Sequence, residues 1–385
     1  MAQKIFEHCI IGSGVSALGA ALGLLDQGVQ DLCLIADPRD ELQYYAPIQI
    51  LRYLGVGGTS RYWHGVIPTR PDIAWRRQIF TRFFDHRADI WSADNLFVPK
   101  TPLRTGSQLR NLLSPDQQLS ATAAHIALRG DVFEVTTQDG ESLLTRKVWC
   151  AAGVIGSLGI LSRSGFCSHS VVLGDHICGF LGMLTAPQAE ILVGRAVAAD
   201  RGPDGYSVPC RFSEDGRTLF TLRPAKFEMR DPYRQNRGGP KFAIGRRQMI
   251  WDLVKSRSFG RLSEAVALKM GIGFQASMYA VHFQHECLTA HICDGKTETL
   301  LPIYDPVSVA DQVTKTAADL EVGLGLVPQQ HFYYGTHLFG AQGLSGLPQG
   351  LHVVDATMTP TIGGGHHSFT QLVQAYRAVQ KVKER

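Results

Sequence analysis

The chain has 385 residues, which at about 150 residues per domain predicts about two to three domains. Hydrophobic residues make up 44% and charged residues 19% of the sequence, and the mean hydropathy is −0.03, a composition that excludes disorder, coiled coil and collagen. No run reaches the roughly 18 apolar residues of a membrane-spanning helix, and a net charge of +4 is too small to indicate nucleic-acid binding. We therefore expect a globular protein with no membrane span and no nucleic-acid partner.

The cysteines and the N-terminus bear on the cellular compartment. The eight cysteines are scattered, with no CxxC pair that could form a zinc knuckle or a redox-active dithiol, so we expect most of them to be buried thiols. The first apolar strand begins at Ile5, which leaves no room for the basic and apolar regions of a signal peptide. The sequence predicts a cytoplasmic protein.

The N-terminal segment has the order of a dinucleotide-binding unit. An apolar run over 5–11 leads into the turn GSGVSA (12–17), a small-residue helix that stops at Gly28, and a second apolar run over 31–37 that ends on an aspartate. Strand, glycine turn, helix, strand and a spaced acid are the elements that such a unit requires. The alternative is a glycine-rich turn without a ligand, and this motif alone does not choose the dinucleotide.

Each small residue of that turn has a predicted role. Gly12 permits the tight turn, Gly14 lets the backbone approach a pyrophosphate, and Ala17 keeps the helix close to the strand. The helix N-terminus would face the phosphates with its partial positive charge. Asp37 would accept hydrogen bonds from ribose hydroxyls.

Three later segments add to this pattern. Residues 55–65 read GVGGTSRYWHG, whose double glycine and hydroxyl residues suit a second pass along a pyrophosphate. Residues 131–150 predict two strands around an Asp139-Gly140 turn, part of a β-meander, and lead into small residues at 151–153. Near the C-terminus, residues 351–370 end in GGGHHSFT, and the spacing of apolar residues from Phe369 onward predicts an amphipathic helix.

These motifs, in this order, resemble the glucose-methanol-choline (GMC) family of FAD-dependent oxidoreductases. The resemblance rests on the N-terminal glycine turn, GGTSRYWHG, AAGVIGSLGILSRSG, and the pair THLFGAQ and VVDATMTPTIGGGHHSFT. It implies an α/β fold, with an FAD-binding Rossmann-like three-layer domain that contains a β-meander and is interleaved with a smaller, trimmed antiparallel-sheet substrate domain. The FAD-binding domain would comprise residues 1–65, 106–185 and 331–385, and the substrate or cap domain residues 66–105 and 186–330.

The resemblance also implies a chemistry. FAD would accept a hydride from a CH–OH group of a small polar alcohol, sugar-like unit or biosynthetic intermediate, and a histidine would act as base. His337 falls where the family has its catalytic histidine, a residue type that titrates near neutral pH; the alternative is a histidine that closes a glycine loop. His366 falls at the family's second catalytic position, and His367 replaces a proline, so either of the two could face the flavin, and His366 is favoured. The alternative is a polar pair that only caps the following helix.

The resemblance carries over to the cofactor contacts residue by residue. The predicted cofactor-binding residues are Gly12, Gly14, Ser16, Ala17, Asp37, Gly57, Gly58, Thr59, Ser60, Trp63, His64, Ala152, Gly153, Asp355, Ala356, His367 and Ser368. Asp355 would contact the ribityl or phosphate region; the alternative is a turn aspartate at a strand end. Tyr62 stands where some family members attach FAD through a histidine, so we expect dissociable FAD, with His64 as the alternative attachment point.

The middle of the chain lies outside the resemblance. Residues 230–261 carry nine basic and two acidic residues, which indicates either a solvated pair of helices or docking of an anionic partner. Residues 278–286 alternate like a strand, so His282 and Gln284 would share a face that lines the substrate pocket. His285 would lie on the opposite face from His282, and we therefore expect no metal site.

Two other functions stay open at this point. The family fold also hosts lyase and decarboxylase chemistry, in which reduced flavin does not accumulate. A flavin-containing, partner-binding protein without turnover is the alternative from another functional class, and the presence of both catalytic-type histidines argues against it.

Overall fold

The computed structural model describes residues 4–45, 50–63, 65–69, 74–85, 90–168, 170–174, 177–184, 186–197, 200–212, 218–224, 274–280, 288–293, 296–302, 329–334, 340, 344, 346–359 and 366–383. Several predicted features lie outside these residues: the basic segment 230–261, His64, the pocket residues His282 and Gln284, and His337.

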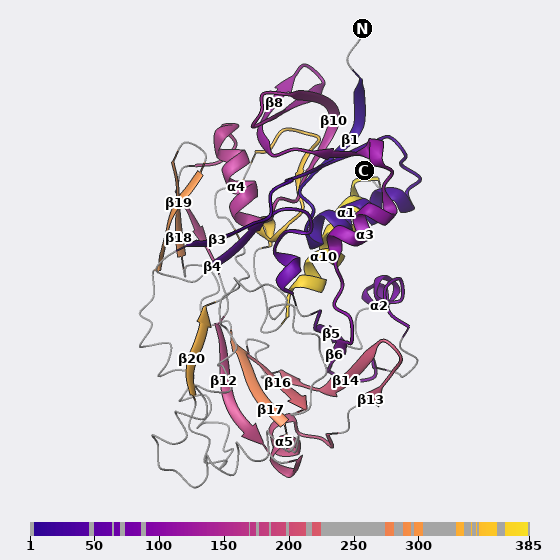
Figure 1. Ribbon diagram of the computed structural model, residues 1–385, viewed down its shortest axis with the longest axis vertical. Helices are drawn as coiled ribbons and strands as arrows, with labels where there is room; N and C mark the ends of the chain where they lie inside the picture. The colour runs from indigo at the N-terminus through magenta and orange to yellow at the C-terminus, as the bar shows by residue number, and fades with distance from the viewer. Residues whose placement is uncertain are drawn as a thin grey trace.

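A seven-stranded, mostly parallel sheet forms the centre of one half of the molecule (Figure 1). The strand order is β7 (Gln118–Ser120), β2 (Leu32–Ala36), β1 (Ile5–Ile11), β10 (Ser142–Cys150), β9 (Val132–Thr137) and β8 (Ala123–Arg129), and β21 (Leu351–Val353) also pairs with β10. The pairs β7–β2, β2–β1, β1–β10 and β10–β21 are parallel, whereas β8, β9 and β10 are antiparallel. The expected meander is therefore present, and its turn contains Gly140 with a φ of 84°.

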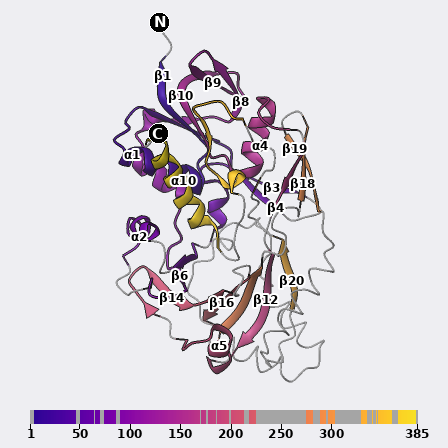
Figure 2. The same ribbon diagram turned by 180° about the vertical axis from the view of Figure 1, so that it is seen from behind.

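The two faces of this sheet are covered by different layers. Because side chains alternate along a strand, Ile10 and Trp149 face one side, where they pack with helices α1 (Val15–Asp26) and α10 (Ser368–Lys383). Cys9 and Cys150 face the other side, where they pack with the meander and helix α4 (Gly153–Arg163). Figure 2 shows α1 and α10 together on one side of the sheet and α4 on the other. The predicted three-layer arrangement is confirmed.

Helices α1 and α10 pack without space for a side chain at two glycines of α1. A Cβ added to Gly19 would lie 2.0 Å from the carbonyl oxygen of Leu372, and one added to Gly23 would lie 3.0 Å from that of Tyr376. Farther along, the side chain of Gln27 donates a hydrogen bond to the carbonyl oxygen of Val379. Contacts advance in the same direction along both helices, so the helices are parallel and their N-termini lie at the same end.

The remaining strands form four antiparallel sheets. The first contains, in spatial order, β15 (Arg211–Phe212), β16 (Thr218–Pro224), β17 (Phe274–Ala280), β12 (Ile177–Leu184) and β20 (Gln329–Tyr334). The second contains β13 (Asp200–Arg201), β14 (Gly205–Pro209), β6 (Asn95–Pro99) and β5 (Ile67–Thr69). The third contains β11 (Ser170–Leu173), β18 (Leu288–Cys293) and β19 (Lys296–Pro302), and the fourth is the hairpin of β3 (Glu41–Tyr45) and β4 (Ile50–Leu54). Helices α2 (Ala74–Phe80), α3 (Thr105–Leu112) and α5 (Ala186–Val193), with 3-10 turns η1 (Gly58–Tyr62), η2 (Pro115–Gln117) and η3 (Ala356–Met358), complete the described elements.

The sequence of strands explains how the two halves interleave. The chain leaves the parallel sheet after η1, forms β5 and β6 beside β14, and returns through α3 (Figure 1). It leaves again at β12, which pairs with β17 and β20. An α/β fold with separate antiparallel sheets was expected and is confirmed; the residue boundaries of the two domains stay a prediction. Within the described part of the chain, no helix combines the length and apolarity needed to cross a bilayer.

Candidate functional site

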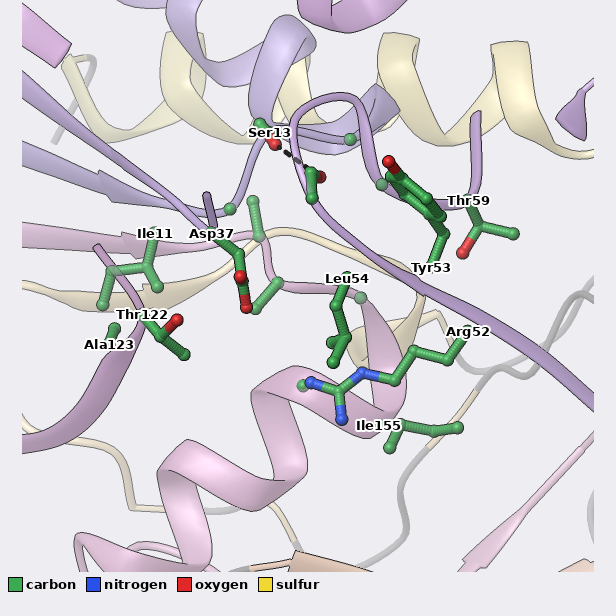
Figure 3. A pocket seen from close by; sticks show the side chains of 18 of the residues that line it. Ile11, Ser13, Asp37, Arg52, Tyr53, Leu54, Thr59, Thr122, Ala123 and Ile155 are labelled. Atoms are coloured by element: carbon green, nitrogen blue, oxygen red, sulfur yellow. Dashed lines mark hydrogen bonds between the residues drawn. The ribbon is translucent and has the colours of Figure 1, made fainter. Parts of the chain in front are cut away.

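A cavity of about 690 Å³ lies at the carboxyl ends of β1, β2 and β10 (Figure 3). Loops that follow neighbouring parallel strands converge at one edge of a sheet, which is where ligands bind in such folds. The predicted cofactor residues that line the cavity are Gly12, Gly14, Ser16, Asp37, Gly58, Thr59, Ala152, Gly153 and Asp355. The fold thus gathers residues from four separate segments around one space.

The first glycine turn has the geometry that its residues predict. Gly12 has a φ of 110°, and a Cβ there would lie 2.3 Å from the carbonyl oxygen of Ala151, so only glycine fits. Gly14 is the N-cap of α1, and the atom nearest to an added Cβ is 4.0 Å away, so the space in front of Gly14 is open. Ser16 and Ala17 are buried in the first turn of the helix. An open helix N-terminus of this kind is a site for an anion.

The second glycine segment lies directly beside the first. Gly57 and Gly58 have φ angles of 96° and 52°, and a Cβ on Gly58 would lie 3.6 Å from Cα of Gly14. The backbone N–H of Gly57 donates to Oγ of Ser13 over 3.0 Å. A hydrogen bond within the protein therefore joins the two predicted phosphate-contacting segments without any ligand.

A buried threonine from helix α3 connects these segments further. Oγ1 of Thr105 lies 2.6 Å from Oγ of Ser60, and 3.2 Å from each of the carbonyl oxygens of Ser13 and Gly57. In a trans peptide the C=O and the following N–H point in opposite directions, so a carbonyl of Ser13 held by Thr105 turns the N–H of Gly14 away from Thr105. No motif signals Thr105, because its role depends on a contact across 92 positions of sequence.

The next residue along, Arg104, stabilises the 3-10 turn η1. Its Nη1 donates to the carbonyl oxygens of Ser60, Arg61 and Trp63 at 3.3, 2.8 and 3.4 Å. The Ser60 carbonyl also accepts from the backbone N–H of Trp63, so Arg104 adds to the hydrogen bonds that end η1. Arg104 and Thr105 therefore both stabilise the second glycine segment through hydrogen bonds to its backbone.

Asp37 lies at the end of β2 as predicted, and it is already hydrogen-bonded. Nε and Nη2 of Arg39 donate to its two carboxylate oxygens at 2.9 and 2.6 Å, and the backbone N–H of Arg39 donates at 3.0 Å. Burial raises the pKa of Asp37, but the hydrogen bonds and charge of Arg39 outweigh burial and lower it. Asp37 is therefore an ionised acceptor, and any ribose hydroxyl would share it with Arg39.

Asp355 is buried against the cavity, with 4% of its surface exposed. It accepts hydrogen bonds from Oγ of Ser157 at 2.5 Å, from the backbone N–H of Thr357 at 3.0 Å, and from the Thr357 hydroxyl. Burial raises its pKa, and these hydrogen bonds oppose the rise. The network fixes Asp355 at the junction of α4 and η3. The backbone N–H of Gly340 donates to the carbonyl oxygen of Ala356, which brings the segment after residue 337 to this junction.

The two C-terminal histidines precede helix α10. His367 is buried, with 7% of its surface exposed, and its carbonyl oxygen accepts from the N–H of Gln371. His366 is half-buried. Since α1 and α10 are parallel, both histidines lie at the same end as the open N-terminus of α1. The cavity itself does not include them, nor the described residues Ala17, Gly57, Ser60, Trp63, Ala356 and Ser368.

Comparison with known proteins places the fold. No family model and no curated protein sequence matches the chain. Among solved structures, pyridoxine 4-oxidase from Mesorbium loti aligns over 99% of this chain and 99% of its own, with 11% identity and a TM-score of 0.55. A fungal aryl-alcohol oxidase aligns over 100% and 99%, with 12% identity and a TM-score of 0.52. An FAD-dependent oxidoreductase from Chaetomium thermophilum aligns over 98% and 99%, with 12% identity and a TM-score of 0.47.

At this level of identity the likeness concerns the fold. The chain has the fold of the pyridoxine 4-oxidase and of the aryl-alcohol oxidase, in agreement with the expected fold class.

Proposed function

We propose that the chain is an FAD-dependent oxidoreductase that oxidises a CH–OH group. The observation that supports this most is the cavity at the carboxyl ends of β1, β2 and β10, in which two adjoining glycine segments face the N-terminus of α1 and Asp37 follows β2. This arrangement suits a dinucleotide whose diphosphate lies between the segments and whose ribose reaches Asp37. Likeness in fold to an aryl-alcohol oxidase and to pyridoxine 4-oxidase points to an alcohol as substrate.

The residues present fit FAD on structural grounds. Gly14 and Gly153 have open space in front of them, so a ligand backbone can approach closely. The N–H of Gly14, turned away from Thr105, and the first amides of α1 would bind the phosphates. Asp37 with Arg39 would hold the ribose hydroxyls, and Asp355 with the residues after β10 would hold the ribityl side. Bound FAD would supply the acceptor for the hydride, which carries both electrons of the oxidation.

The histidines would accept the proton of the alcohol and hydrogen-bond to its oxygen. Oxidation of an alcohol removes a hydride from carbon and a proton from oxygen, and His337 would take that proton as general base. His366 would donate a hydrogen bond to the oxygen as negative charge develops there. His367, which is more deeply buried, would support the loop that carries His366. A separate fixed positive charge is not needed to stabilise the developing negative charge, because the N-termini of α1 and α10 lie at this end of the site.

Anaerobic reduction kinetics of single variants test these roles. With a panel that includes pyridoxine and benzyl alcohol, His337→Ala should slow reduction of bound flavin by about 10²- to 10⁴-fold, the usual contribution of a general base. His366→Ala should slow it by a similar factor and His367→Ala by much less. Unchanged reduction rates in His337→Ala and His366→Ala would contradict the proposed base and partner. A flavin that no alcohol reduces would favour non-oxidative chemistry or a partner-binding role.

FAD is proposed to be dissociable, because Tyr62 occupies the position of covalent attachment in related enzymes.

The basic segment 230–261 is proposed, on its charge alone, as a contact for an anionic partner. Charge reversal of Arg246 and Arg247 should then lower turnover without loss of flavin, and unchanged kinetics would contradict it.

A further inference from the structure

A buried polar pair joins the end of η3 to the first turns of helix α10. The side-chain amide nitrogen of Gln371 donates to Oγ1 of Thr359 over 3.1 Å, and that hydroxyl lies 3.3 Å from the amide oxygen of Gln371. Only 7% of Thr359 and 6% of Gln371 is exposed, so both polar groups are removed from water. Among the described residues, the Thr359 hydroxyl has one further partner, the exposed Gln374 at 3.4 Å. The pair therefore ties together two segments that are 12 positions apart in the sequence.

This pair spans the segment that carries His366. The backbone N–H of Gln371 donates to the carbonyl oxygen of His367 over 2.8 Å. Gln371 thus binds His367 through its backbone and Thr359 through its side chain, while residues 360–365 lie outside the described part of the chain. Fixing two points of a chain restricts the positions open to the residues between them. His366 is directly next to one of these two points.

The same hydrogen bonds continue to the segment of the other histidine. The backbone N–H of Gly340, three residues after His337, donates to the carbonyl oxygen of Ala356 over 2.9 Å. The N–H of Thr359, which ends η3, donates to that same carbonyl over 3.1 Å. A continuous path of hydrogen bonds therefore leads from the residues after His337, through Ala356 and Thr359, to Gln371.

Stability alone does not explain a polar pair at this position. A buried amide and hydroxyl that bind each other contribute little more than an apolar pair of the same shape. Phe369 and Leu372, on the same helix, are fully buried apolar residues, so an apolar side chain at 371 would suit its surroundings. Hydrogen bonds differ from apolar contacts in that they fix both distance and direction, and satisfied buried networks hold one arrangement. The pair is therefore suited to fix the geometry of the two segments that it joins.

We propose that Gln371 is a positioning residue that places His366 relative to His337 for oxidation of the alcohol. Gln371 acts through the carbonyl of His367 and through Thr359, at a distance from the reacting atoms. The inference rests on the proposed function, because it assigns the alcohol oxygen to the space between the two histidines. Because a misplacement of about 1 Å can cost up to about 100-fold in rate, loss of the amide should affect flavin reduction more than FAD binding.

Anaerobic stopped-flow reduction of the FAD-loaded full chain tests the proposal, with pyridoxine and benzyl alcohol as the probes. Gln371→Met keeps the length of the side chain and removes the amide, and it should lower the limiting reduction rate by about 10- to 100-fold. Thr359→Val should lower the rate by a similar factor. The Kd for FAD should not change in either variant. In a His366→Ala background, Gln371→Met should slow reduction no further, because its effect passes through His366.

Unfolding midpoints of the same proteins separate positioning from folding. Each single substitution removes a hydrogen bond of a buried polar partner and should lower the midpoint, whereas Thr359→Val combined with Gln371→Met makes an apolar pair and should recover it. Reduction should stay slow in the double variant. Gln380 provides a matched control, because it lies on the same helix and its amide donates to the carbonyl oxygen of Gly23 over 2.9 Å. Gln380→Met should leave the reduction rate unchanged.

The contrary outcomes distinguish this inference from the proposed function. If Gln371→Met is reduced at the wild-type rate, or slows the His366→Ala protein as much as it slows the wild type, Gln371 does not position His366. Recovery of the rate together with the midpoint in the double variant would show a purely structural pair and would also overturn the inference. A wild-type flavin that no alcohol reduces would instead refute the proposed function, and this inference with it.

Discussion

Replacement of Gly19 by alanine should force helices α1 and α10 apart. The added Cβ would lie 2.0 Å from the carbonyl oxygen of Leu372 and 3.1 Å from Cβ of Ala375, so the clash is with backbone, which cannot rotate away. Overpacking of this kind costs about 3 kcal/mol, whereas alanine gains about 1 kcal/mol of helix propensity over glycine. The net expectation is a loss of about 2 kcal/mol in the free energy of unfolding.

The same substitution at two other glycines provides graded controls. Gly23→Ala should cost less, because its closest contacts are 3.0 Å. Gly14→Ala meets no atom closer than 4.0 Å, so its cost to the apoprotein should be limited to the loss of a better N-cap residue, about 1 kcal/mol or less. Yet Gly14→Ala should strongly weaken FAD binding, because the Cβ occupies the space through which the backbone approaches the phosphates.

Urea unfolding of the three apoproteins, followed by circular dichroism, measures the stability terms, and fluorescence titration measures FAD affinity. Gly19→Ala should be the most destabilised of the three variants, and Gly14→Ala should show the largest loss of FAD affinity. A Gly19→Ala variant as stable as the wild type would refute the close parallel packing of α1 and α10. That packing is also what aligns His366 with the glycine turn.

Three further outcomes follow from buried groups and from the attachment site. Thr105→Val, which keeps the shape but removes the hydroxyl, should weaken FAD binding by leaving the Ser13 carbonyl without its donor, and Thr105→Ser should restore it; equal FAD affinity in all three proteins would contradict the role of Thr105. Burial, aided by the charge of Lys147, lowers the pKa of His8 from 6.5 to about 4. The unfolded chain then binds a proton below pH 6.5, whereas the folded chain does not take it up until about pH 4. As the pH is lowered from 6.5 to 4, the free energy of unfolding should therefore fall by at most about 3 kcal/mol. His8→Gln should flatten that part of the stability–pH curve. Acid precipitation should release all of the flavin into the supernatant, because Tyr62 cannot form a histidyl bond; yellow colour in the pellet would disprove this.

The sequence is most informative where the residues that form a feature lie close together along the chain. Gly12, Gly14 and Asp37 lie within one strand–helix–strand unit, so spacing alone places them at one sheet edge, and they do line the cavity. The meander turn at Gly140 is likewise local. Asp355 is identified only through a motif; it lies buried between α4 and η3 at the cavity, and its contact with a cofactor stays a prediction.

The features that escaped prediction all depend on long-range contacts. Thr105 reaches Ser13 and Gly57 across 92 and 48 positions, and nothing near Thr105 in the sequence marks it. The pairing of Arg39 with Asp37 is local, but a surface arginine two residues after an acid has no signature of ligand binding. Arg52 lies in a short hairpin whose placement over the cavity only the fold reveals.

The visible spectrum of the purified protein, recorded before and after anaerobic addition of candidate alcohols, tests the central proposal most directly. We expect a yellow protein whose visible flavin absorption is lost with an alcohol that is its substrate. Recovery of that absorption in air would identify an oxidase. A colourless protein that cannot be reconstituted with FAD would contradict the cofactor assignment and every role derived from it.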